Sequence, residues 1–263
     1  MSLYSRIGVP VALVAIALLG SFALTGPAHD ANLGGLSFTL SGNTLLGLIA
    51  IGLAGTGTDA IARSHPRAQR GQLRRPFLCA ILPTIFTAAA WVLLGRLPAL
   101  QTRIMGIAAT AVALALLILM EYFVANPAAR GRSTLLILLQ FVTYAVAAVL
   151  YGAIYPASDV TVARVVAVVS AFLAFRVLGE DELPPGRILG ASLGVGLLLG
   201  GVAWLLHSRV DSAVTCSLTW VVCLYTLVGL ARQFLRDNLR REVVLEYAMV
   251  GLVAFVLLFF ATR

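Results

Sequence analysis

The sequence predicts an all-α integral membrane protein, built as a bundle of about nine transmembrane helices. Hydrophobic residues make up 60% of the 263 residues and charged residues only 11%, a composition outside the range of soluble globular domains. Apolar runs long enough to cross a hydrocarbon core of about 30 Å, which takes about 20 helical residues, recur along the whole chain. Because no separate soluble domain fits between these runs, we expect a single transmembrane domain over residues 1–263.

The first apolar run, residues 7–24, is either a retained helix or part of a cleaved signal peptide. It is longer than the apolar region of a typical signal peptide, which covers roughly 7 to 15 residues. We therefore interpret it as a retained first helix near residues 7–25, and the sequence leaves cleavage open as the alternative.

Eight further helices are expected between breaks formed by proline, glycine and clusters of charge. The second is the longest, near residues 37–62, and the segment LSFTLSG at its start can instead lie along the membrane interface. The remaining seven are expected near residues 77–95, 104–124, 134–155, 159–178, 188–207, 212–231 and 243–261.

The arginines predict the orientation of these helices. All nineteen basic residues are arginine, and the absence of lysine excludes Schiff-base chemistry such as a retinal linkage. With nine crossings, fourteen arginines fall on the side of the N-terminus and five on the other side. Since short loops rich in arginine stay on the cytoplasmic side, we expect a cytoplasmic N-terminus, an external C-terminus and a plasma or inner membrane location.

Three carboxylates lie at or just inside the predicted cytoplasmic membrane boundary: Asp59, Glu121 and Glu246. A carboxylate at the centre of a bilayer costs about 2.5 to 3.5 kcal/mol, so an ionisable residue inside a helix is a functional hypothesis. Structural alternatives exist for each of them. Asp59 can pair with Arg63 at i,i+4 spacing, Glu121 stands at a helix end, and an arginine of residues 232–241 can neutralise Glu246.

The stretch GTGTDAIARSHPRAQRGQLRRP, residues 55–76, concentrates positive charge in the first predicted cytoplasmic loop. Its arginines are candidate contacts for anionic lipid headgroups or for a substrate phosphate: Arg63, Arg67, Arg70, Arg74 and Arg75. A positive-inside anchor that touches anionic lipid accounts for them without a substrate.

The seventh predicted helix contains two glycine pairs at small-xxx-small spacing, Gly190/Gly194 and Gly196/Gly200. At about 100° per residue the two pairs lie on different faces of the helix, so two neighbouring helices can approach it closely. This pattern predicts helix packing.

Histidine and cysteine are too sparse for a metal centre or a disulfide. His29, His65 and His207 lie far apart and at no ligand spacing, so we expect no metal or haem bound through histidine and no cofactor. The cysteines Cys79, Cys216 and Cys223 fall inside predicted helices. Cys216 and Cys223 are two turns apart, about 10 Å, which is too far for a disulfide, so we interpret all three as packing residues.

The topology and the charged cytoplasmic loops after the second and sixth helices resemble those of the intramembrane aromatic prenyltransferases. The two loops read GTGTDAIARSHPRAQRGQLRRP and FRVLGEDELPPGRILG. The resemblance implies Mg²⁺ ions that bridge loop carboxylates to a substrate pyrophosphate. Here the first loop offers only Asp59 where that family has an asparagine and two aspartates, and the second offers EDE in direct succession instead of aspartates four residues apart.

The sequence contains no nucleophile elbow, Walker loop, HExxH or paired-histidine motif, so it offers no positive sign of an enzyme. We therefore expect a non-catalytic integral subunit or scaffold of a membrane protein complex. Its expected partners are other integral membrane proteins and anionic lipid headgroups, and not nucleic acid. A transporter-like carrier that uses Glu246, Asp59 or Glu121 is the alternative, and a prenyltransferase-like lipid-processing enzyme is a lesser one.

Overall fold

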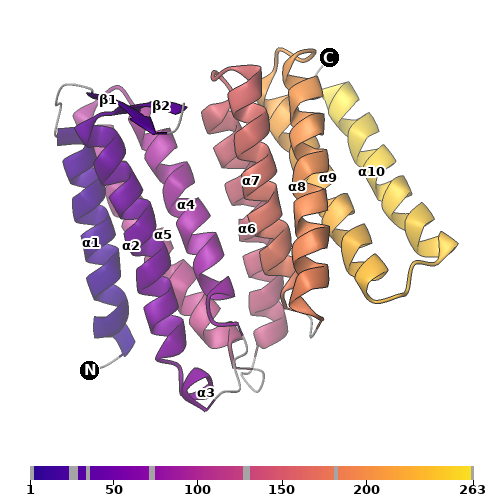
Figure 1. The fold of residues 1–263 in the computed structure, drawn as a ribbon, viewed down its shortest axis with the longest axis horizontal. Helices are drawn as coiled ribbons and strands as arrows, with labels where there is room; N and C mark the ends of the chain where they lie inside the picture. The colour runs from indigo at the N-terminus through magenta and orange to yellow at the C-terminus, as the bar shows by residue number, and fades with distance from the viewer. Residues whose placement is uncertain are drawn as a thin grey trace. The chain divides into compact units, whose positions relative to one another are not determined.

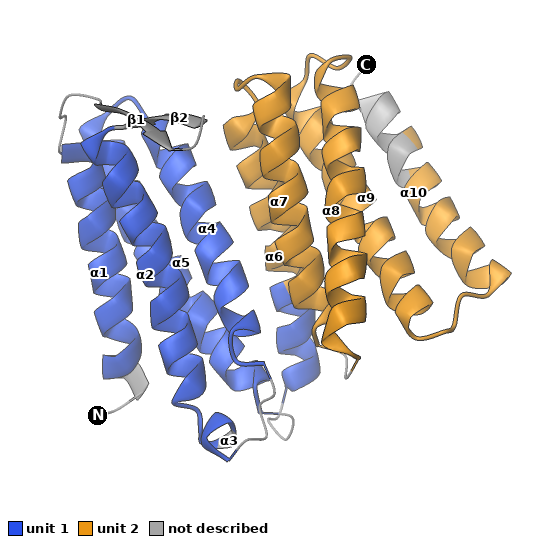
Figure 2. Cartoon of the chain, viewed as in Figure 1, with its two compact units in different colours: residues 1–139 blue, residues 140–263 orange. Residues whose placement is uncertain are grey.

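A computed structural model describes residues 3–23, 29–33, 36–70, 75–126, 131–180 and 183–261. Long helices dominate these residues (Figure 1). The chain divides into two compact units, residues 1–139 and 140–263 (Figure 2).

The first unit contains four long helices: α1 (Leu3–Ala23), α2 (Gly42–Arg63), α4 (Leu78–Gly95) and α5 (Leu100–Val124). A short helix, α3 (Pro66–Gln69), follows α2, and the first turns of α6 (Arg132–Ile154) also belong to this unit. Helix α2 packs against both α1 and α4, and α1 also packs against α5. Leu18, Ala50 and Leu114 lie at the centre of this core with no exposed surface.

A two-stranded antiparallel sheet connects α1 to α2, formed by β1 (His29–Leu33) and β2 (Leu36–Leu40), with His29 paired to Leu40. The expected start of the second helix near residue 37 is therefore wrong, because the helix begins at Gly42. Two features of the sequence explain the later start. Apolar and polar residues alternate through LSFTL, which is the period of a strand, and the hydroxyl of Ser41 caps the helix by accepting a hydrogen bond from the Thr44 amide at 3.2 Å.

The second unit consists of the rest of α6 and four further helices: α7 (Asp159–Leu178), α8 (Pro185–His207), α9 (Ala213–Leu235) and α10 (Arg241–Ala261). Helix α8 packs closely against α7 on one side and contacts α9 on another, and α10 packs on α9. The indole nitrogen of Trp220 on α9 donates a buried hydrogen bond to the Ser170 hydroxyl on α7 at 3.0 Å. This bond ties α9 to α7 inside the unit.

Eight helices in the described part of the chain are long and apolar enough to cross a membrane: α1, α2 and α4 to α9. Helix α10, with 21 residues, occupies the place of the ninth expected span. The structure therefore confirms the helical, multi-pass character that the composition predicts. Most helix ends lie within four residues of the expected ones, and α7 coincides with residues 159–178.

Candidate functional site

The carboxylate of Asp59 forms an ion pair within its own helix. Asp59 lies in the last turn of α2, and its Oδ2 accepts a hydrogen bond from Nε of Arg63 at 2.7 Å. The Arg63 side chain is 65% exposed, so the pair lies at the edge of the bundle, where such pairs contribute roughly 0 to 1 kcal/mol. The second carboxylate oxygen of Asp59, Oδ1, is buried and accepts no hydrogen bond from the described residues.

Glu121 is enclosed in the same unit, only 4% exposed in the last turn of α5. Next to it, the ring of Tyr122 meets the ring of His65 edge to face, with 4.6 Å between the ring centroids. His65 follows the end of α2 and is itself only 7% exposed. The structure thus brings the start of the arginine-rich loop to the end of α5, a proximity that the sequence does not indicate.

The arginines of residues 63–75 differ in how far their side chains are exposed. Arg63 and Arg70 are exposed and Arg75 is half-buried. The side chain of Arg67 and the whole of Arg74 lie outside the described residues, so the structure assigns no position to these two candidate contacts.

Glu246 lies in the other unit, on α10, where it is exposed. The opposite side of α10 packs on α9, where the Tyr247 ring covers Gly229 and Gly251 approaches the Thr226 methyl group. No described residue forms an ion pair or a hydrogen bond with the Glu246 side chain. Glu246 therefore sits in a different environment from Asp59 and Glu121.

A buried arginine in α7 was not singled out as a site by the sequence. Arg176 is only 4% exposed, and its Nη1 donates to the Thr143 hydroxyl of α6 at 3.5 Å. The guanidinium lies in the interior of the second unit, where it contacts another helix.

A small polar cluster closes one end of the second unit. The hydroxyl of Tyr155 donates to the Val210 carbonyl at 2.8 Å, and the Tyr155 ring meets the His207 ring at 4.7 Å between centroids. Nε2 of His207 lies 3.4 Å from Oδ1 of Asp159, a pair that is ionic only when His207 is protonated. Burial, with smaller effects of Cys216 and Asp211, raises the pKa of Tyr155 and keeps its hydroxyl a donor. These contacts join the loop ends around α6, α7 and α8.

The glycine pairs of α8 have different surroundings on the two sides of the helix. A Cβ at Gly196 would lie 2.5 Å from the Ala167 carbonyl oxygen, and one at Gly200 would lie 2.8 Å from the Ala167 methyl group. At Gly190 and Gly194 a Cβ would meet no heavy atom within 4 Å. The pair Gly196/Gly200 therefore lets α7 approach closely, whereas the pair Gly190/Gly194 faces open space.

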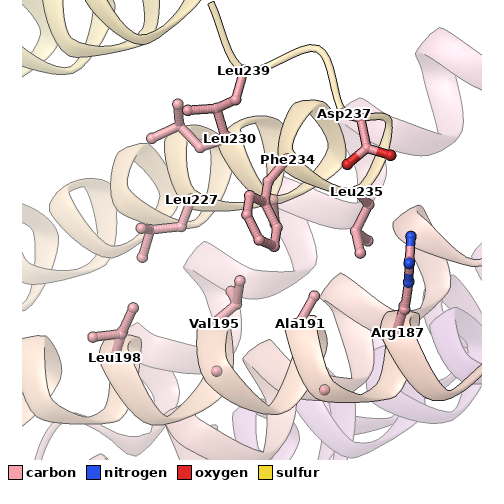
Figure 3. A pocket seen from close by; sticks show the side chains of 13 residues that line it. Arg187, Ala191, Val195, Leu198, Leu227, Leu230, Phe234, Leu235, Asp237 and Leu239 are labelled. Carbon is pink, nitrogen blue, oxygen red and sulfur yellow. The ribbon is translucent and has the colours of Figure 1, made fainter.

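The open side of α8 lines a groove of about 750 Å³ between α8 and α9 (Figure 3). Apolar and small residues cover most of its length: Gly190, Gly194 and Leu198 from α8, and Leu227, Leu230 and Phe234 from α9. Arg187 and Asp237 stand together at one end of the groove (Figure 3). Two consecutive helices form this groove, and in the sequence only the glycine pattern of α8 hints at it.

The described residues contain no group of three or more His, Cys, Asp or Glu side chains that could hold a metal ion. Cys79, Cys216 and Cys223 are free thiols. Of the second loop that resembles a prenyltransferase motif, Glu180 belongs to the described residues, whereas residues 181–182 lie outside them.

Fold and sites together define a multi-pass helical membrane protein. Residues 25–261 match the family DUF5656, described as a protein of unknown function, and the chain belongs to this family. No curated protein and no solved structure matches the chain.

Proposed function

We propose that this protein is a non-catalytic integral subunit or scaffold of a membrane protein complex, with α10 as its docking helix. The observation that carries the proposal is the exposed carboxylate of Glu246 on α10. Glu246 lies about 8 Å along the helix from its first residue, beside the exposed side chains of Met249 and Val250. A carboxylate on an apolar membrane helix is costly unless a cation meets it.

Apolar side chains are exposed on α10 beside Glu246 and beyond it, and Leu245, Leu252 and Val253 are each more than half exposed. This surface fits one class of partner, a transmembrane helix of another subunit that carries an arginine or a lysine. Such a helix would pair its cation with Glu246, which favours association in a bilayer, and its side chains would pack on the apolar residues in place of lipid.

The polar groups of the other helices support a structural role. Buried hydroxyls donate to carbonyls one turn earlier in their own helices, as Thr58 does to Ala54 at 2.7 Å and Ser192 to Ile188 at 2.7 Å. Trp220 is satisfied by Ser170, and Asp59 pairs with Arg63. Polar side chains used in this way hold helices in place.

Mild detergent extraction of the tagged, full-length protein tests the proposal. We expect the protein to elute as a complex with a second integral membrane protein. Glu246→Arg should release that partner, because two cations would then face each other. The matched control Glu242→Gln removes an exposed carboxylate at the start of the same helix and should leave the complex intact. A solitary monomer with no co-purifying protein would refute the proposal.

A carrier is the second candidate, favoured by the burial of Glu121 in α5. An ionisable side chain enclosed by membrane helices can take up and release a proton during transport. In vesicles that contain a pH-sensitive dye, a carrier would move protons across the membrane, and Glu121→Gln would stop this movement while Glu242→Gln would not. Vesicles with the parent protein that stay as proton-tight as empty ones would exclude the carrier.

We also infer a cytoplasmic N-terminus, an external C-terminus and nine crossings in a plasma or inner membrane, supported by the excess of arginine in alternate loops. Single cysteines at Arg70 and Arg209, in a variant without the native cysteines, test this orientation. A thiol reagent that does not cross membranes should label position 209 in intact cells and position 70 only after lysis. The reverse pattern would overturn the orientation.

A further inference from the structure

We propose that the groove between α8 and α9 binds one phospholipid with an ethanolamine headgroup, whose phosphate meets Arg187 and whose ammonium meets Asp237. The site uses another face of α9 than the one that packs on α10, and it does not depend on the proposed subunit role. Neither the sequence pattern nor the family membership assigns it.

The length of the groove matches one leaflet of a bilayer. On α8 it extends from Arg187, near the start of the helix, to Leu198. Eleven residues at about 1.5 Å each give a depth of about 16 Å, close to half of a hydrocarbon core of about 30 Å. An acyl chain that enters at the charged end would therefore lie in the groove along its whole length.

The lining suits a hydrocarbon chain. Leu227, Leu230 and Phe234 lie along one side of α9 at helical spacing, and Phe234 points toward Val195 on α8 (Figure 3). Opposite them, Gly190 and Gly194 leave room that a larger side chain would fill. An acyl chain would fill the groove and make van der Waals contacts with its apolar lining without displacing any described side chain.

The two charges at the mouth of the groove, the end with Arg187 and Asp237, select the headgroup. Arg187 and Asp237 are both exposed, and neither side chain forms an ion pair or a hydrogen bond with any described residue. Asp237 has a left-handed backbone with φ of 52°, just beyond α9, which aspartate tolerates better than most residues. This turn ends α9 and places the carboxylate at the rim of the groove.

One positive and one negative group on the lining correspond to a zwitterionic headgroup. A guanidinium binds phosphate oxygens through charged hydrogen bonds, and a carboxylate accepts hydrogen bonds from a primary ammonium. A choline headgroup has no N–H to donate, and a glycerol headgroup has no positive charge for Asp237. The mouth should therefore prefer ethanolamine to both.

Native mass spectrometry of the delipidated, full-length protein in detergent tests the site with dioleoyl phosphatidylethanolamine, phosphatidylcholine and phosphatidylglycerol. We expect one ethanolamine lipid to bind about tenfold more tightly than either of the others. Arg187→Gln should weaken all three lipids about tenfold, because they share the phosphate. Asp237→Asn should remove the preference for ethanolamine and favour the anionic glycerol lipid.

Two glycine variants distinguish lipid bound in this groove from lipid that binds unspecifically around the transmembrane helices. Gly194→Leu places a side chain inside the groove and should abolish binding of the single lipid. Gly201→Leu is its control, because Gly201 lies on the same helix, also has no heavy atom within 4 Å of a Cβ, and does not line the groove. Both variants should keep the unfolding temperature of the parent protein, since both positions are open.

Three results would overturn the proposal. The first is equal lipid binding by Gly194→Leu and Gly201→Leu, which would place the lipid elsewhere. The second is phosphatidylglycerol or phosphatidylcholine bound as tightly as phosphatidylethanolamine, which would remove the headgroup assignment. The third is a photo-reactive residue at position 198 that crosslinks a polypeptide in cells instead of a lipid, which would make the groove a protein interface.

Discussion

Two faces of α8 carry the same small-residue spacing and have opposite surroundings. At Gly196 and Gly200 the backbone of α7 lies so close that a Cβ would touch the Ala167 carbonyl or its methyl group. At Gly190 and Gly194 the helix borders a groove of about 750 Å³. A glycine pair therefore permits close approach without deciding what approaches, because the neighbour must also offer a small and complementary face. Helix α7 does so with Ala163, Ala167 and Ala171.

The largest expected effect on stability tests the closed face of α8, the face with Gly196 and Gly200 that packs on α7. Gly196→Leu would force a side chain against the Ala167 carbonyl, which belongs to a helix backbone and cannot turn away. Overpacking costs about 1–3 kcal/mol and occasionally more, and a leucine against an unyielding backbone belongs at or above the upper end of this range, so the thermal unfolding temperature in detergent should fall markedly. Gly194→Leu is the matched control on the open face and should unfold like the parent protein. Equal losses at both positions would show that the two faces do not differ in packing.

A smaller loss of stability is expected when the hydrogen bond between Trp220 of α9 and Ser170 of α7 is removed. Ser170→Ala would leave the indole N–H of Trp220 buried without its acceptor, at a cost of about 1–3 kcal/mol to the stability. Thermal unfolding measures this loss, and tryptophan fluorescence should report the changed environment of Trp220. Ser208→Ala removes an exposed hydroxyl beyond the end of α8 and serves as the control. An unchanged stability of Ser170→Ala would mean that the bond contributes nothing.

The smallest effects have opposite signs on the two faces. An alanine methyl group at position 190 would meet no neighbouring atom, and alanine reduces the conformational freedom of the unfolded chain. Gly190→Ala should therefore raise stability by about 0.5–1 kcal/mol. Gly200→Ala places its methyl group 2.8 Å from the Ala167 methyl group and should lower stability instead. Chemical unfolding of the two variants under the same conditions gives the comparison. A stabilised Gly200→Ala would contradict the closeness of α7.

The sequence predicted the helices well where their ends carry local signals. Helix α7 lies at Asp159–Leu178 as expected, since Pro156 precedes it and Gly179 follows it. The start of α2 was missed because a five-residue strand is too short for its alternation to stand out against a long apolar helix. The ion pair of Asp59 with Arg63 follows from i,i+4 spacing and is present in the structure.

The sequence predicted less about the candidate sites than about the helices. The burial of Glu121, and the contact of Tyr122 with His65 beside it, depends on two helices that are far apart in the chain. The inward turn of Arg176 toward Thr143 depends on α6 in the same way. No spacing within one helix contains this information, because the contacting groups belong to different segments.

By itself, the sequence determined that this protein is a multi-pass helical membrane protein and where most of its helices begin and end. Apolar composition and run length suffice for this, since every backbone polar group in a bilayer must be satisfied inside a helix. Only the tertiary structure decided which face of α8 is closed by α7 and which remains open beside α9. The physical reason is that packing is a property of two surfaces, and each helix sequence describes only one of them.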